Sequence, residues 1–142
     1  MASTGVRWVE MSQLEWGDFD LQRGVVRVQT AKQRVKYVTR VIPLTYNLTR
    51  ALKEAHAGKQ PLADIPNYWT AKDRFAAIVS RNGIQGGSLH TLRHTFASHL
   101  VQKGISLYVV SKLLGHSTIT TTEIYAHLSP SNFHDAVGLL PY

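Results

Sequence analysis

The sequence predicts an α+β fold: a mainly α-helical domain that carries a small three-stranded antiparallel sheet. Two patterns support this fold class. Residues 14–44 follow a two-residue apolar period and are rich in β-branched side chains, whereas most of the remaining chain follows the period of a helix. The 142 residues are enough for one hydrophobic core, so we expect a single domain over residues 1–142.

The first third of the chain predicts a helix followed by the sheet. The helix is expected over residues 4–14, with Ser3 or Thr4 as its N-cap. The strands are expected near residues 14–16, 25–28 and 37–42. Turn residues at 18–20 and 22–24 separate the first two strands, and the turn before the third strand is basic. The predicted sheet is therefore an antiparallel meander.

The rest of the chain predicts helices with polar caps and glycine or asparagine stops. Serine and threonine accept hydrogen bonds from the unpaired N–H groups of a first helical turn, and glycine adopts the left-handed conformation that ends a helix. The expected helices run from Thr45 to Gly58, from Thr70 to Asn82, from Leu89 to Val101, from Ser106 to Gly115, over a short segment that carries Tyr125, and from Ser131 to Leu140.

The composition favours a polyanionic partner. Sixteen Lys and Arg against nine Asp and Glu give a net charge of +7 and a pI near 9.9, so nucleic acid is the first partner to consider. The sequence has no cysteine, which excludes disulfides and thiol nucleophiles. It has neither an apolar run long enough to span a bilayer nor a signal peptide at residues 1–5. We therefore expect a cytoplasmic protein with no membrane partner.

The densest group of potentially catalytic side chains begins at His90. His90, Arg93 and His94 are neighbours on one helix face at positions i, i+3 and i+4, where imidazole and guanidinium can bind one phosphate. A solvated helix face with the same residues is the alternative. A zinc site at His90 and His94 is disfavoured, because the glutamate that a metalloprotease helix needs is replaced by Thr91.

Five segments follow one another along the chain: Thr4–Glu10, Leu14–Asp20, Val38–Leu44, Leu89–Ala97 and Leu113–Ser129. Together they resemble the catalytic domain of the tyrosine recombinase, or phage integrase, family. The segment Leu113–Ser129 (LLGHSTITTTEIYAHLS) resembles its C-terminal box, and Leu89–Ala97 (LHTLRHTFA) its second-arginine box. Thr4–Glu10 (TGVRWVE) is similar to the first-arginine box, Leu14–Asp20 to the strand that follows it, and Val38–Leu44 to a later strand. The resemblance covers essentially the whole chain in order, and it implies the fold of the DNA breaking-rejoining enzymes.

The resemblance implies a role for each matching residue. Arg7 and Arg93 would clamp the non-bridging oxygens of a scissile DNA phosphate, and His90 and His116 would complete the pocket. Tyr125 would attack the phosphorus and form a 3′-phosphotyrosyl bond. Fixed cationic donors can stabilise the charge that builds up on the phosphate, so we expect no metal and no other cofactor.

The family also uses a lysine from the β-hairpin as the general acid for the leaving 5′ oxygen. Lys32 is the first candidate and Lys36 the second, because the spacing between them does not settle the register of the hairpin. The resemblance gives Glu10 a role in the fold near Arg7 and His94 a role in orienting its neighbours.

The implied function is site-specific DNA recombination, in integration, excision or resolution. Its partners would be double-stranded DNA, further copies of the chain in a tetramer on DNA, and accessory DNA-bending proteins, with the complex associated with the nucleoid. Family members carry a core-binding domain and further helices before the first-arginine box. Because that box begins at residue 4, we expect a chain that lacks these parts. The alternatives are a catalytically inactive DNA-binding remnant and a type IB topoisomerase relative.

Overall fold

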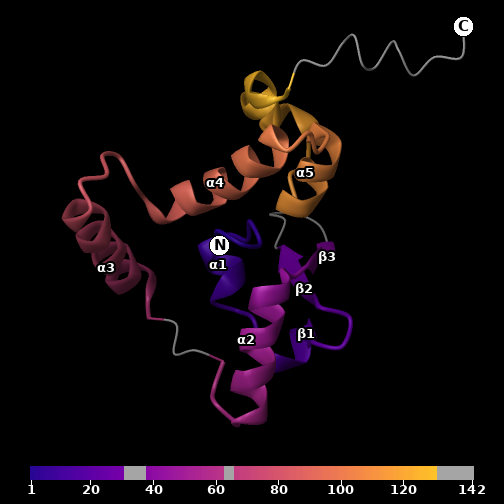
Figure 1. The fold of residues 1–142 in the computed structure, drawn as a ribbon, viewed down its shortest axis with the longest axis vertical. Helices are drawn as coiled ribbons and strands as arrows, with labels where there is room; N and C mark the ends of the chain where they lie inside the picture. The colour runs from indigo at the N-terminus through magenta and orange to yellow at the C-terminus, as the bar shows by residue number, and fades with distance from the viewer. Residues whose placement is uncertain (31–37, 63–65, 131–142) are drawn as a thin grey trace, which may run out of the picture.

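A computed structural model describes residues 1–30, 38–62 and 66–130 and confirms the α+β fold class. The elements in chain order are α1 (Trp8–Met11), η1 (Trp16–Asp18), β1 (Phe19–Asp20), β2 (Val25–Thr30), β3 (Val38–Pro43), α2 (Tyr46–Ala57), α3 (Tyr68–Arg81), α4 (Leu89–Gln102), α5 (Leu107–Leu114), η2 (Ile119–Thr121) and η3 (Glu123–Leu128), where η marks a 3₁₀ helix. Figure 1 shows α5 beside β3 at one end of the sheet, α4 running from the side of α3 toward α5, and α3 set to one side.

The sheet has the order β1-β2-β3, and both strand pairs are antiparallel. Its two-residue period turns Val26 and Val28 of β2 and Ile42 of β3 toward one face, where each is no more than 1% exposed. These side chains form an apolar cluster with Val6, against which Leu113 of α5 packs. The sheet therefore fixes both the N-terminal segment and α5.

A second apolar cluster joins α4, α5 and η3. It contains Ala97 and Val101 of α4, Val110 and Leu114 of α5, and Tyr125 of η3. Ser106 caps α5, and Gly115 ends it in the left-handed conformation at φ 71°. Both ends of α5 lie where the sequence predicted them, and the short helix around Tyr125 is confirmed as η3.

The N-terminal helix is shorter than predicted. Gly5 has a φ of +67°, and the backbone of Arg7 is extended, so α1 starts only at Trp8. The N–H of Arg7 donates to the Glu10 carboxylate over 2.7 Å, which closes the first turn. Ser3 and Thr4 are therefore not the N-cap.

The predicted strand at residues 14–16 and the predicted cap at Thr70 are also wrong. The Glu15 N–H donates to the Asp18 carboxylate over 2.9 Å, and this local bond favours the 3₁₀ turn η1 over a strand. Asn67 caps α3 by accepting from the N–H of Thr70 over 3.0 Å, so Thr70 lies within the first turn. The helix expected from Ser131 lies outside the described residues. Among the residues described, no helix is long and apolar enough to cross a membrane.

Candidate functional site

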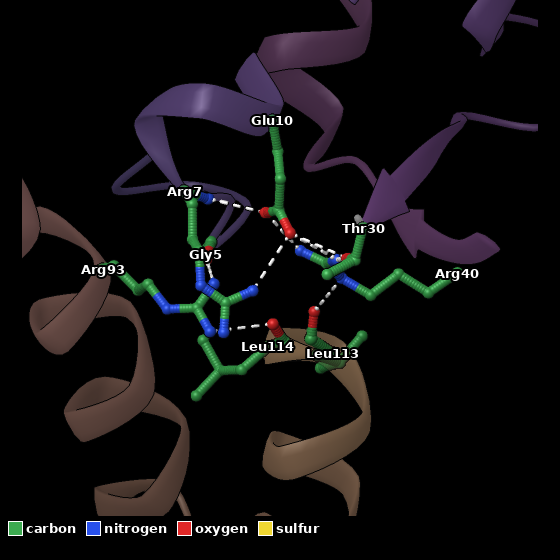
Figure 2. A network of polar contacts seen from close by, with 8 residues as sticks. All are labelled: Gly5, Arg7, Glu10, Thr30, Arg40, Arg93, Leu113 and Leu114. Atoms are coloured by element: carbon green, nitrogen blue, oxygen red, sulfur yellow. Dashed lines mark hydrogen bonds and ion pairs between the residues drawn. The ribbon is translucent and has the colours of Figure 1, made fainter. Parts of the chain in front are cut away.

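Arg93 of α4 lies at the centre of the site and ties three segments together. Its side chain is 2% exposed. Nη1 donates to the Gly5 carbonyl over 2.6 Å, and Nη2 donates to the Leu114 carbonyl over 2.8 Å (Figure 2). Burial and the nearby charge of Arg7 together lower the pKa of Arg93 to about 10, so the guanidinium is still charged at neutral pH.

Gly5 allows the N-terminal segment to approach Arg93. A Cβ at this position would lie 2.5 Å from Phe96 and 2.9 Å from Leu114, and the φ of +67° is unfavourable for other residues. Val6, the next residue, is 3% exposed in the sheet cluster. Close backbone packing at Gly5 therefore sets the position of Arg7 relative to α4.

A buried ion pair between Glu10 and Arg40 lies beside these residues (Figure 2). Nη1 and Nη2 of Arg40 donate to the Glu10 carboxylate over 2.9 and 2.7 Å, and its Nε donates to the Leu113 carbonyl over 2.9 Å. The Thr30 hydroxyl donates to the same carboxylate over 2.8 Å. Burial alone would raise the pKa of Glu10, but these bonds, with the N–H of Arg7, lower it to about 2.

This network also positions Arg7. The Nη1 of Arg7 lies 3.1 Å from the Glu10 carboxylate, while 37% of the Arg7 side chain remains exposed. Glu10 therefore supports the fold around Arg7, as the sequence indicated. Arg40 was not predicted as a site residue.

His116 follows the left-handed Gly115 and lies close to the arginines. Its Nδ1 is 2.8 Å from the hydroxyl of Thr122, which is fully buried. Burial, together with the nearby charges of Arg93 and Arg7, lowers the pKa of His116 to about 4. The imidazole is therefore neutral at physiological pH, and one of its nitrogens is already engaged.

His90 lies one turn before His94 on α4. The two rings meet edge to face, with centroids 4.8 Å apart. Partial desolvation lowers the pKa of His90, as do the neighbouring His94 and Arg93. His90 is exposed on the surface of the site.

Tyr125 completes the group from η3. Its ring belongs to the core and is 6% exposed, and its hydroxyl lies 2.5 Å from Nδ1 of His94. Burial raises the pKa of Tyr125, although the charge of Arg93 opposes this effect. The phenol is therefore protonated at neutral pH.

The structure thus brings five of the six predicted site residues into one region: Arg7, His90, Arg93, His116 and Tyr125. The sixth, Lys32, and its alternative Lys36 lie outside the described residues. Over the ranges that the structure describes, no three His, Cys, Asp or Glu side chains are grouped to hold a metal ion.

Sequence reasoning missed Arg40 and Thr122. For Arg40 a signal was present: it shares its strand face with the inward-facing Ile42, and a charge in that register predicts a buried partner. For Thr122 the signal was weak, because four of the five residues at positions 118–122 are threonine.

The arrangement suits attack on a phosphate. Arginines and imidazoles held by the protein supply donors where negative charge builds up on phosphoryl oxygens. A tyrosine hydroxyl is a nucleophile that can form a covalent intermediate.

Comparisons with known proteins find similarity to one family. The model of the phage integrase family matches residues 1–132. The putative integrase of Pseudomonas phage Pf1 is 34% identical over 142 residues, which cover 98% of this chain and 40% of that protein. The catalytic domain of the bacteriophage HP1 integrase superposes with a TM-score of 0.76 at 30% identity, covering 99% of this chain and 77% of that one.

A third similarity shows the same fold. The XerH site-specific recombinase, solved bound to its difH substrate, has a TM-score of 0.72 at 24% identity, over 99% of this chain and 44% of that one. The chain spans between 39% and 50% of the length of the curated relatives that it matches.

Proposed function

This chain belongs to the phage integrase family, and from that premise we propose that it performs the DNA cleavage and rejoining of site-specific recombination. The observation that carries the proposal is that Tyr125 packs against α4, the helix of Arg93, and that Arg7 and His116 lie close to the same arginine. The biological outcome would be integration, excision or resolution.

In this mechanism Arg7 and Arg93 bind the non-bridging oxygens of the scissile phosphate. Among the described residues, Arg93 uses two of its five N–H groups on backbone carbonyls, which hold the guanidinium in place for the phosphate. Arg7 is partly exposed and can contact the DNA directly. Two fixed positive charges would stabilise the additional negative charge of the transition state.

His90 and His116 serve as further donors to the phosphate. The Thr122 hydroxyl can donate to Nδ1 of His116, which leaves Nε2 with a proton to donate to a phosphoryl oxygen. A neutral imidazole suits this task, because it donates without the cost of burying another charge. His90 contributes from the exposed edge of α4.

Tyr125 attacks the phosphorus, and the bond to the 5′ oxygen breaks. The product is a 3′-phosphotyrosyl bond, which keeps the phosphodiester energy so that a second 5′ hydroxyl can later displace the tyrosine. The mechanism invokes no ATP, metal or other cofactor.

A lysine general acid would protonate the leaving 5′ oxygen, and Lys32 remains the first candidate before Lys36. A DNA substrate with sulfur in place of that oxygen tests this role, since a thiolate leaves without a proton. The Lys32→Ala variant should cleave normal DNA slowly and the sulfur-substituted DNA at the wild-type rate. Lys36→Ala is the matched control. If only Lys36→Ala cleaved normal DNA slowly, the general acid would be Lys36 and not Lys32.

Double-stranded DNA is the proposed partner, with several copies of the chain assembled on it. The net charge of +7 supports DNA binding, and XerH provides a DNA-bound relative of the same fold. Accessory DNA-bending proteins and association with the nucleoid belong to the same proposal.

Trapping a covalent adduct tests the proposed activity. A pool of nicked duplexes of random sequence should become covalently linked to the wild-type chain. Cleavage close to a nick frees a short fragment that carries the 5′ hydroxyl, and once this fragment diffuses away the strand cannot be rejoined. Tyr125→Phe should bind the same DNA in a gel-shift assay and form no adduct. DNA binding by the wild type without an adduct would favour the alternative, a catalytically inactive DNA-binding remnant.

A further inference from the structure

The hydroxyl of Tyr125 has a defined partner in His94. Nδ1 of His94 lies 2.5 Å from the hydroxyl, and the two rings are 5.8 Å apart between centroids. Among the described residues, no other hydrogen bond of this hydroxyl is present. Tyr125 packs in the core formed by α4, α5 and η3, and this packing fixes its hydroxyl beside His94.

The chemistry of attack requires such a partner. Burial raises the pKa of Tyr125, so the phenol arrives protonated and must lose its proton as the oxygen bonds to phosphorus. A nucleophile becomes effective when a base lies within hydrogen-bond distance of the atom that reacts. An imidazole nitrogen 2.5 Å away meets that requirement.

The other polar groups of the site are oriented elsewhere. Two N–H groups of Arg93 donate to backbone carbonyls, and Nδ1 of His116 faces Thr122. His90 contacts the ring of His94 edge to face rather than the tyrosine hydroxyl. Of the two α4 histidines in the site, His90 is therefore exposed, and His94 contacts the hydroxyl of the nucleophile.

We propose that His94 is a catalytic residue that accepts the proton of the Tyr125 hydroxyl during attack on the scissile phosphate. The proton passes to Nδ1 as the bond from the tyrosine oxygen to phosphorus forms. The phosphorus–5′ oxygen bond breaks, and its electron pair leaves with the oxygen, which is protonated by the general acid. In rejoining, a DNA 5′ hydroxyl attacks the phosphorus and gives its proton to the deprotonated general acid. The bond between phosphorus and the tyrosine oxygen breaks, and His94 returns its proton to that oxygen. The inference rests on the proposed function.

The variant His94→Asn tests the inference, because its amide can keep a hydrogen bond to Tyr125 but cannot take up a proton. We expect single-turnover cleavage of a nicked duplex, selected from the random pool, to slow by roughly 100-fold, as for loss of a general base. DNA binding should be unchanged. His99→Asn, on the exposed surface of the same helix, is the matched control and should cleave at the wild-type rate.

A fluorinated tyrosine at position 125 separates proton transfer from packing. Its phenol ionises at lower pH and depends less on a base, so it should recover about tenfold or more of the cleavage rate in His94→Asn and change the wild-type rate little. Melting temperatures check that each variant folds. If His94→Asn does not fold, His94→Gln takes its place.

The outcomes are distinct. Slow cleavage by the His94 variant with recovery by fluorotyrosine supports the inference. Wild-type rates in that variant, or slow cleavage that fluorotyrosine does not recover, would overturn it and leave the proposed function intact. A wild-type chain that binds the duplexes and forms no adduct would overturn the proposed function, and the inference with it.

Discussion

Replacing Glu10 with glutamine should destabilise the protein by about 3 kcal/mol at pH 7. The pKa of Glu10 is lowered from 4.5 to about 2 in the folded chain, and each pKa unit corresponds to about 1.4 kcal/mol. Glu10 is 6% exposed and its partner Arg40 is 9% exposed, so solvent screens the pair little. Loss of one partner also leaves the other charge buried without compensation.

The same shift predicts how the loss depends on pH. Above pH 4.5 the carboxylate is ionised in both the folded and the unfolded chain, and its full contribution is present. Below pH 4.5 Glu10 becomes protonated in the unfolded chain but stays ionised in the folded chain down to about pH 2. Its contribution to the free energy of unfolding therefore falls over that window. The stability difference between the wild type and Glu10→Gln should therefore be constant from pH 7 to 5 and close to zero near pH 2.

Urea denaturation at a series of pH values measures this difference. Glu54→Gln is the matched control: Glu54 lies 4.0 Å from Arg50 but is 74% exposed, so its loss should change stability by less than about 0.5 kcal/mol. Equal stability of the wild type and Glu10→Gln at pH 7 would refute the reasoning. So would a difference that persists undiminished to pH 2.

Two further substitutions test how the site is built. Thr122→Val keeps the buried volume but removes the hydroxyl partner of His116. We expect an unchanged affinity for DNA and about tenfold slower single-turnover cleavage. An unchanged cleavage rate would show that the contact does not orient His116. Gly5→Ala places a Cβ 2.5 Å from Phe96 at a φ of +67°. We expect the free energy of unfolding, measured by urea denaturation, to fall by about 2 kcal/mol. Cleavage should also slow, because the Gly5 carbonyl that binds Arg93 must move, and wild-type stability would contradict this prediction.

The sequence predicted best those parts of the fold that a few neighbouring residues decide. The cap at Thr45, the cap at Ser106 and the stop at Gly115 all lie where expected, because each depends on hydrogen bonds or backbone angles within one turn. The predicted start of α1 was wrong because Gly5 is left-handed and Arg7 is extended, in a segment whose Gly5 carbonyl bonds to Arg93, which is distant in sequence.

The site shows the same division between local and distant contacts. The residue types at positions 90, 93, 116 and 125 could be identified from their spacing and resemblance. Their partners could not, since Arg40 bonds to a carbonyl 73 residues away and His94 meets Tyr125 across 31 residues. The burial of Arg93 on two carbonyls also depends on how α4 packs against α5 and the N-terminal segment.

Peptide mapping of the DNA-linked chain tests the central claim most directly. Wild-type protein trapped on a nicked duplex is digested with a protease and a nuclease, and the modified peptide is sequenced by mass spectrometry. We predict a single modified residue, Tyr125, bound through a phosphate to the 3′ end of the cleaved strand. A link to any other residue, or to the 5′ end, would contradict the assignment of Tyr125 as the nucleophile.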